Sequence, residues 1–261
     1  MVSLDGRGVI VTGASRSGGI GAAVARRLAA DGARLFLTGW ADHDAEQPWG
    51  ADAAGGAPLR DDLRRKGTVA EYLSVDLADP EAPARIMAAA RAALGRVDVL
   101  VANHARSSRQ SLLDLTAAEM DLSFAVNARS TLLLARSFVE QHDGAQGGRI
   151  VLFTSGQYHG AMPEELPYIA SKAAVQQLTA TLAVSLAPRG ITVNCVNPGP
   201  NDTGYAVGEL RRRVEEAMPA GRWGRPDDAA RLVAWLCSDD AAWVTGQTIA
   251  SDGGWSARGA S

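Results

Sequence analysis

Seven short apolar runs alternate with helical patterns along the 261 residues of the chain. The runs lie at residues 9–12, 34–38, 70–75, 97–102, 150–154, 192–196 and 248–251. Most of the central runs are nearly continuous in Val, Ile and Leu, which is typical of parallel strands buried on both faces. Repeated strand–helix–strand units make right-handed crossovers. We therefore expect a single α/β domain of the Rossmann type, with a doubly wound, seven-stranded, mainly parallel sheet and helices on both faces.

The helices between these runs have recognisable ends. A helix is expected over residues 19–30, and Asp79 and Pro80 read as the cap and first-turn proline of the next one. Thr116 and Glu119 have the spacing of a capping box. Further helices are expected at residues 59–65, 168–187 and 227–237.

Residues 40–66 form a long irregular stretch that contains several glycines and prolines. We expect a flap here that leads into the short helix at 59–65. Trp40 and Trp49 would pack this flap down or cover a ligand, and a loop without a function is an equal alternative.

The composition excludes several classes of function. The net charge of −3, without a basic run and interleaved aromatic residues, does not indicate nucleic-acid binding. No apolar run reaches the roughly 18 residues of a membrane span. Cys195 and Cys237 lack the spacing of a metal site and are interpreted as buried, reduced thiols. The histidines show no helical ligand spacing, so no metal is expected, and the protein is expected to be cytoplasmic.

A glycine cluster follows the first strand and opens the first helix. In this position glycines let the backbone turn tightly and approach a pyrophosphate at the positive end of the helix. We therefore expect a dinucleotide site, although a glycine-rich turn without a ligand is the alternative. The candidate contacts in this cluster are Gly13, Ser15, Arg16, Gly19, Ile20 and Gly21.

The end of the second strand discriminates between dinucleotides. An acidic residue there binds the ribose 2′-hydroxyl and repels a 2′-phosphate. Residues 38–40 read Thr-Gly-Trp, with no acid before Asp42, and Arg16 can pair with a 2′-phosphate. We therefore expect NADP(H) in preference to NAD(H), with NAD(H) as the alternative. Asp76 and Leu77, after the third strand, are candidate adenine contacts, unless Asp76 caps the strand end.

Tyr168 and Lys172 lie four residues apart on an expected helix, and Ser155 lies upstream of them. Residues i and i+4 share one helix face, so the phenol and the ammonium can point into the same cavity. Lys172 is one of only two lysines among the 26 Lys and Arg residues. The three side chains form a candidate proton-transfer site. An ordinary aromatic–cation pair on a surface helix is the alternative.

With these motifs in order, the chain resembles the short-chain dehydrogenase/reductase family over nearly its whole length. The family's Tyr-x-x-x-Lys pair matches Tyr168 and Lys172, and its catalytic serine matches Ser155. Its catalytic asparagine, on the helix after the fourth strand, matches Asn127. The resemblance implies an NAD(P)-dependent enzyme that interconverts a ketone and a secondary alcohol. It also implies a homotetramer built on the two central helices and the last strand.

Further motifs of the family complete the expected cofactor site. The Pro-Gly signature after the sixth strand appears as Pro198 and Gly199, and the threonine that holds the nicotinamide carboxamide matches Thr203. Asn103 is retained from the family's Asn-Asn-Ala-Gly turn after the fourth strand.

The expected mechanism gives each of these side chains a task. The dinucleotide carries the hydride, and Tyr168 supplies a proton to the substrate oxygen. One ammonium ~4 Å away at an effective dielectric of ~20 supplies the ~4 kcal/mol that lowers a phenol pKa by ~3 units, so Lys172 is expected to lower the pKa of Tyr168. Lys172 would also hold the ribose hydroxyls, and Ser155 would stabilise negative charge on the substrate oxygen. By the resemblance, Asn127 would hold a water between Lys172 and solvent.

Two features depart from the family pattern. The glycine loop is spaced Gly-x5-Gly-x-Gly, which is similar to the enoyl reductase branch. That branch places its tyrosine seven residues before the lysine, where this chain has Glu165, so we retain the ketone-reductase interpretation. The turn at 102–105 reads Ala-Asn-His-Ala, which changes the brace of the central helix and makes His104 a candidate substrate contact.

The substrate class is left open. A 3-oxoacyl-thioester reductase-like enzyme is the nearest type. Reductases that act on acyl carrier protein usually carry basic residues before the fifth strand, where residues 141–148 are nearly neutral and only Arg189 remains as a docking charge. A small free ketone or alcohol is therefore an alternative, and a dinucleotide-binding regulator without turnover is another.

No linker divides the chain, so residues 1–261 are expected to form one domain. Its cofactor half extends to about residue 155, and its substrate and catalytic half covers 156–261. The expected substrate wall consists of residues 156–167 and 201–219.

Overall fold

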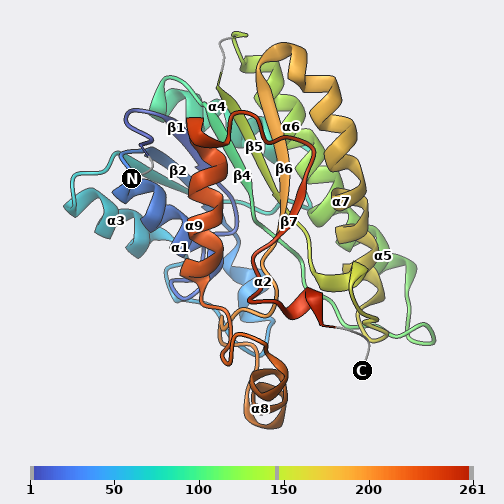
Figure 1. The fold of residues 1–261 in the computed structure, drawn as a ribbon. Coiled ribbons are helices and arrows are strands. Elements are labelled where there is room, and N and C mark those ends of the chain that lie inside the picture. Colours follow the sequence, from blue (N-terminus) through green and yellow to red (C-terminus); the bar gives the residue numbers. More distant parts are fainter. Residues whose placement is uncertain (1–2, 145–146, 259–261) are drawn as a thin grey trace.

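The structure is a computed structural model that describes residues 3–144 and 147–258. A seven-stranded sheet with the order β3-β2-β1-β4-β5-β6-β7 runs through the molecule (Figure 1), and each pair of neighbouring strands is parallel. The strands are β1 (Gly8–Val11), β2 (Arg34–Gly39), β3 (Ala70–Ser74), β4 (Val99–Ala102), β5 (Gly148–Phe153), β6 (Ile191–Asn197) and β7 (Thr248–Ala250). This confirms the expected doubly wound fold, with a sheet that is parallel across all seven described strands.

Helices cover both faces of the sheet, as Figure 1 shows. One face carries α1 (Ile20–Ala30), α3 (Ala57–Arg65) and α9 (Pro226–Cys237). The other face carries α4 (Ala82–Leu94), α6 (Ser130–Gln141) and α7 (Leu166–Leu186). Three other helices are α2 (Ala41–Ala45), α5 (Ala117–Ser123) and α8 (Gly208–Ala217).

The two apolar cores explain why the central strands are apolar at most positions. In β1, Val9 and Val11 belong to the core under α1 and α9, whereas Ile10 belongs to the core under α4 and α6. In β2, Leu35 belongs to the first core and Phe36 to the second. Successive side chains of a strand point to opposite faces, so a strand covered on both sides has no polar face.

Two helix starts test the caps that were expected from the sequence. The prediction that Asp79 and Pro80 begin a helix was wrong, because α4 begins at Ala82 with Glu81 as its N-cap. The carboxylate of Asp79 instead accepts a hydrogen bond from the Glu81 backbone N–H at 2.9 Å, in a turn that precedes the helix. The Thr116 cap is present: its hydroxyl accepts from the Glu119 N–H at 3.2 Å.

A π-helical segment, Phe124–Arg129, joins α5 to α6. Such wide turns are uncommon in helices and are frequent at functional sites. Here the segment carries Asn127, which is buried.

The strand order places a cleft at the carboxyl edge of the sheet. The chain runs outward from β1 to β2 and β3, and then crosses back to β4 on the other side of β1. Ligands of open α/β sheets bind where the strand order reverses in this way. Ala145 and Gln146, within the nearly neutral stretch before β5, lie outside the described residues.

Candidate active site

A cavity of about 450 Å³ lies at the carboxyl edge of the sheet. Its walls come from the glycine loop, the ends of β2 and β3, α2, the turn after β4, Tyr168 and Thr203. It brings together most of the residues predicted to contact the cofactor, namely Gly13, Ser15, Arg16, Gly19, Ile20, Asp76, Leu77, Asn103 and Thr203.

The glycine loop has the shape of an anion cradle. Gly13 has φ +70°, and a Cβ there would lie 2.8 Å from the Cα of His104. A Cβ at Gly18 would meet no atom within 4 Å, so the loop is open at this position. The first turn of α1 carries no acidic residue, and Gly19 offers no capping side chain. A pyrophosphate fits these features, since free N–H groups and the helix dipole favour an anion.

Three predicted cofactor residues lie outside the cavity lining and support its shape. A Cβ at Gly21 would lie 2.2 Å from the Gly13 carbonyl oxygen, so this glycine lets α1 pack against the loop. Gly199 has φ +62°, and its Cβ would lie 2.3 Å from the Cβ of Asp252. The Pro198 carbonyl accepts a hydrogen bond from the Asn201 side chain at 2.6 Å.

Two predicted contacts of the dinucleotide are engaged within the protein. The amide of Asn103 donates to the carbonyls of Thr12 and Gly13, both at 3.1 Å, and so braces the glycine loop. The carboxylate of Asp76 accepts from the Ala78 N–H at 2.8 Å, which is the strand-end cap considered as its alternative role. Both residues still line the cavity.

An acidic residue that the sequence analysis did not consider lies beside the end of β2. Asp44, on α2, turns back toward the glycine loop and accepts a hydrogen bond from the Ser15 hydroxyl. Burial raises the pKa of the Asp44 carboxyl, while the Ser15 hydrogen bond and the charge of Arg16 oppose that shift. The strand end itself carries no acid, but Asp44 places a carboxylate in the pocket beside it.

Arg16 reaches from the glycine loop to the opposite wall of the cavity. Its Nη2 donates to the Thr203 carbonyl at 2.7 Å, and its guanidinium lies 5.6 Å from the centre of the Trp49 ring. Burial lowers the pKa of Arg16, and Asp44 and Asp52 act in the opposite direction.

Tyr168 and Ser155 meet at one end of the cavity. Ser155 follows β5 and caps a short 3-10 turn, and Tyr168 lies in the first turn of α7. Burial raises the pKa of the Tyr168 phenol, a hydrogen bond with the Ser155 side chain lowers it, and the Glu165 carboxylate raises it further. The backbone of Ser155 is held by Gln157, whose side-chain oxygen accepts its N–H at 3.2 Å.

The expected net lowering of the Tyr168 pKa is absent, because burial is the largest influence on the pKa of this phenol. The Lys172 Nζ, in a side chain only 3% exposed, donates to the backbone carbonyls of Phe153 at 3.1 Å and His104 at 3.4 Å. Burial lowers the pKa of Lys172 itself to about 8. The phenol pKa moves upward because loss of solvent outweighs the favourable contacts around it.

Asn127 uses its side-chain amide to bind two other segments of the protein. Its Oδ1 accepts from the Arg106 N–H at 2.6 Å, and its Nδ2 donates to the Arg106 carbonyl at 3.0 Å and to the Ser171 hydroxyl at 2.9 Å. The amide therefore fixes the peptide of Arg106 against α7. Its expected role in holding a water between Lys172 and solvent stays a prediction.

His104 braces the inside of the protein and also lines the cavity, so its contact with substrate stays a prediction. One ring nitrogen lies 2.7 Å from the Thr12 hydroxyl, and the other lies 3.0 Å from the Val126 carbonyl and 2.8 Å from the Ser130 hydroxyl. A carbonyl only accepts, so Nε2 carries the proton. Burial lowers the pKa of His104 to about 3, which keeps the ring neutral near pH 7.

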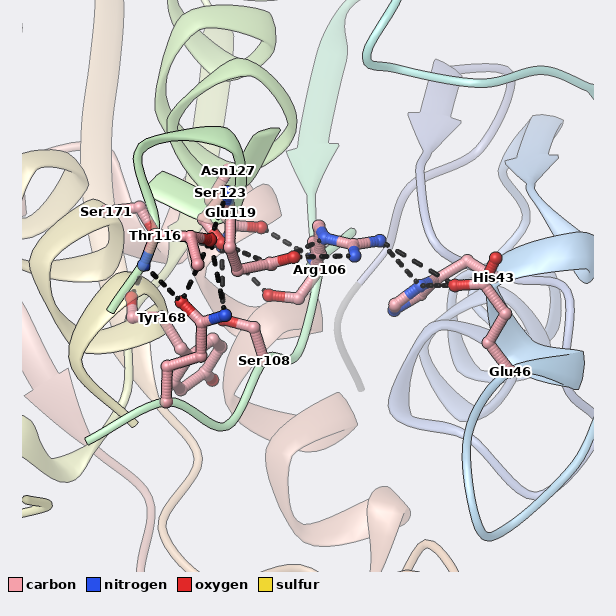
Figure 2. A network of polar contacts seen from close by, with 11 residues as sticks. His43, Glu46, Arg106, Ser108, Thr116, Glu119, Ser123, Asn127, Tyr168 and Ser171 are labelled. Carbon is pink, nitrogen blue, oxygen red and sulfur yellow. Dashed lines mark hydrogen bonds and ion pairs between the residues drawn. The ribbon is translucent and has the colours of Figure 1, made fainter. Parts of the chain in front are cut away.

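Arg106 lies at the centre of a polar network between the two halves of the cleft (Figure 2). On one side its guanidinium binds both carboxylate oxygens of Glu119, at 2.8 and 2.9 Å. On the other side its Nη1 lies 3.4 Å from His43 Nδ1 and 3.9 Å from a carboxylate oxygen of Glu46, both in the segment after β2. The Glu119 carboxylate is therefore bound to Arg106, which explains why only the Thr116 half of the expected capping box forms.

The expected substrate side of the cleft carries aromatic and charged groups near Tyr168. Burial, together with the neighbouring Tyr168 and Glu165, raises the pKa of the Tyr205 phenol to about 12. Burial also raises the pKa of Glu165, while the charge of Arg109 opposes that shift. Tyr158 accepts a hydrogen bond from the Asn197 amide at 3.3 Å.

Four residues of the site were missed by the sequence analysis: Asp44, Arg106, Glu119 and Gln157. Glu119 was assigned only to a helix cap, and Asp44 lay too far beyond the second strand for the usual position of an acid. Gln157, two residues after Ser155, was a readable signal, because a side-chain amide at this distance commonly closes a local turn on the backbone.

The fold and the cleft define a Rossmann-type protein with a glycine-loop site and a Ser–Tyr–Lys cluster. Comparisons with known proteins narrow this class. A family model described as Enoyl-(Acyl carrier protein) reductase matches residues 13–256. YjdA of Bacillus subtilis, an uncharacterized oxidoreductase, is 40% identical over 247 residues, which cover 94% of this chain and 95% of that protein.

Solved structures of similar proteins support the same assignment to an oxidoreductase family. A dehydrogenase/reductase from Sinorhizobium meliloti has a TM-score of 0.86 and 36% identity, over 97% of this chain and 96% of that one. A short chain dehydrogenase from Burkholderia cenocepacia, in complex with NADP, has a TM-score of 0.86 and 34% identity, over 96% and 98% of the two chains.

The chain belongs to the short-chain dehydrogenase/reductase family. It is an enzyme of the type that acts on CH–OH groups with NAD(P) as acceptor. Within the described residues, no helix has the length and apolar character needed to cross a membrane.

Proposed function

We propose that the protein is an NADP(H)-dependent enzyme that interconverts a ketone and a secondary alcohol. The observation that carries this proposal is the meeting of the Ser155 and Tyr168 hydroxyls beside the glycine-loop cavity, with Lys172 buried one turn further along α7. Within one domain, the part up to about residue 155 would bind the cofactor, and the part from 156 onward would supply Tyr168, Lys172 and the substrate wall.

The chain's own residues bind and protonate the substrate oxygen in this proposal. A bound dinucleotide supplies the hydride to the carbonyl carbon. Ser155 donates a hydrogen bond to the carbonyl oxygen, and Tyr168 transfers its phenolic proton to that oxygen. Because burial raises the pKa of Tyr168, the phenol keeps its proton at neutral pH and is ready to act as an acid in the direction of reduction.

Lys172 would stabilise the phenolate that remains after this transfer, and Asn127 would hold the turn around Arg106 in place. A buried cation acts strongly on a developing charge because little water screens it. The direct contacts of Asn127 support a positioning role.

The preference for NADP(H) is supported by two features of the pocket and opposed by one. The end of β2 carries no acid, and the guanidinium of Arg16 lines the cavity, where it can pair with a 2′-phosphate. A related short chain dehydrogenase is described in complex with NADP. Asp44 acts against a 2′-phosphate, and NAD(H) therefore remains the alternative.

For the substrate we propose a 3-oxoacyl thioester or a related ketone. The description of the matching family model names an acyl carrier protein substrate, which favours an acyl thioester. The nearly neutral stretch before β5 gives little for an acidic carrier protein to dock on, which favours a small free ketone as the second candidate.

Replacement of Tyr168 by Phe tests the proposal. We expect Tyr168→Phe to lower kcat/KM for ketone reduction by a factor of about 10³, in the range that one general acid contributes. Its affinity for NADPH should stay within about twofold of the wild-type value. The assay follows NADPH oxidation with a panel of free ketones and 3-oxoacyl thioesters, and with NADH in parallel.

A matched control is Tyr72→Phe, which removes a buried hydroxyl on β3 that has no hydrogen-bond partner among the described residues. This variant should retain wild-type turnover. Unchanged turnover in Tyr168→Phe would show that the phenol is not the acid. Binding of NADPH without turnover of any carbonyl by the wild-type protein would favour a regulator.

A further inference from the structure

One short segment after β2 supplies a whole wall of the cavity. Five of the lining residues lie between positions 40 and 49: Trp40, His43, Asp44, Glu46 and Trp49. None of the α2 residues is buried, so this wall is held by side-chain contacts and not by a core of its own. We call residues 40–52 the β2 flap.

The β2 flap contacts the glycine loop at three points. Asp44 accepts from the Ser15 hydroxyl, and Asp52 accepts from the Ser17 backbone N–H at 2.6 Å. The ring of Trp49 lies 5.6 Å from the guanidinium of Arg16. The flap is therefore tied to the loop that would hold a pyrophosphate.

The same segment also reaches the two loops on the opposite side of the cleft. His43 and Glu46 face Arg106, after β4, at 3.4 and 3.9 Å. Trp49 packs edge-on against Tyr205, after β6, with ring centres 6.3 Å apart and an interplanar angle of 77°. The β2 flap therefore contacts three loops around the cavity: the glycine loop, the loop after β4 and the loop after β6.

Closely packed glycines lie at both ends of the β2 flap. Gly39 at the end of β2 lies so close to Ser15 that a Cβ would approach within 2.6 Å. Gly55 and Gly56, just beyond the flap, are buried against the ring of Tyr72. Between these points Gly50 has φ +70° with open space around it. Such a segment opens locally at low cost, because few buried apolar contacts must be broken.

We propose that the β2 flap is a cover that closes over the bound dinucleotide, and that Trp49 is a positioning residue that holds Arg16 and Tyr205 against it. The proposal rests on dinucleotide binding as described under the proposed function. An exposed ion pair and an edge-on aromatic pair are each weak, so the cover can open to exchange its ligand and still slow the ligand's escape.

The dissociation rate of NADPH tests this proposal. Stopped-flow fluorescence of bound NADPH, chased with excess NADP⁺, gives the rate constant. Trp49→Leu should raise this constant by more than about threefold, the effect of losing one aromatic contact. Trp49→Phe keeps a ring and should stay within about twofold of wild type. Trp243→Leu, which changes a tryptophan 98% exposed outside the cavity, should have no effect.

Hydrogen exchange of the wild-type protein gives a second measurement that needs no variant. The amides of residues 41–50 should exchange more slowly with saturating NADPH than without it. An increase of less than threefold in folded Trp49→Leu, or equal exchange of these amides with and without NADPH, would overturn the cover. Failure of the wild-type protein to bind either NADPH or NADH would instead overturn the proposed function.

Discussion

Lys172 is a cation inside the protein whose hydrogen-bond partners among the described residues are two backbone carbonyls. Burial is the largest cause of its low pKa, and the influence of Cys195 opposes it only in part. Carbonyl dipoles compensate a lost hydration shell less well than a carboxylate would. The charge of Lys172 is therefore present at neutral pH but is lost at a pH that an enzyme assay can reach.

We predict that ketone reduction falls as the pH rises through about 8. Below this pH Lys172 is charged and can stabilise the phenolate that Tyr168 leaves behind. Above it, kcat/KM should fall by up to tenfold per pH unit, because the protonated fraction of Lys172 falls by that factor. Initial rates of NADPH oxidation between pH 6 and 10 measure the profile.

Lys66, the other lysine of the chain, offers the control for this profile. It lies at the end of α3 in an exposed ion pair with Asp62. Lys66→Met should keep the fall near pH 8. A rate that stays flat to pH 10 in the wild-type protein would rule out the role given to Lys172.

At the scale of secondary-structure elements, His104 ties three of them together. It follows β4, binds the hydroxyl of Thr12 at the end of β1, and donates to the Val126 carbonyl in the π-helical segment. The family's usual turn braces the central helix with an asparagine and small residues, and here an imidazole fills that place. The brace works only while the ring is neutral, since a second ring proton would face a neighbourhood that already contains Lys172.

We predict that His104 makes the fold sensitive to acid. The pKa of His104 is about 3 in the folded protein and ~6.5 when unfolded. Above pH ~6.5 the ring is neutral in both states. As the pH falls below this value only the unfolded chain takes up the proton, so the free energy of unfolding falls by about 1.4 kcal/mol per pH unit.

Urea unfolding at pH values from 7 to 4 measures this slope. In His104→Asn, the free energy of unfolding should depend less steeply on pH, by about the contribution of one proton. This difference is expected whatever the stability of the variant at pH 7. An equal slope in the two proteins would show that His104 takes up its proton while folded.

The elements and the centre of the site could be predicted from the sequence for specific reasons. Strands buried on both faces leave continuous apolar runs, as in residues 9–11 and 99–101. Tyr168 and Lys172 share a helix face by spacing alone. The start of α4 could not be predicted, because the Asp79 carboxylate caps a turn and not the helix.

The remaining features depend on tertiary structure. The pair formed by Arg106 and Glu119 joins the turn after β4 to α5, and no sequence periodicity connects those positions. The direction of the Tyr168 pKa shift depends on burial, which residue spacing does not give. Asp44 reaches the pocket only because α2 folds back toward Ser15.

At the scale of the whole molecule, we predict a homotetramer. Helix α7 has apolar residues around much of its circumference, and Val184 on it is 79% exposed in the single chain. Light scattering after size-exclusion chromatography should give about 109 kDa, four times the chain mass of 27.2 kDa. A mass near that of one chain at micromolar concentration would contradict the prediction.

The packing of α1 against α9 has a consequence for the chain as it is made. The buried face of α1, which includes Ala22, Val24 and Leu28, shares a core with Ala230 and Val233 of α9, and these helices lie about 200 residues apart in the sequence. A ribosome that adds roughly 5–20 residues per second needs roughly 10–40 s to bridge that interval. Throughout that time the nascent chain exposes the apolar face of α1. The yield of folded protein in a cell will therefore depend on chaperones that shield this face until α9 has been synthesised.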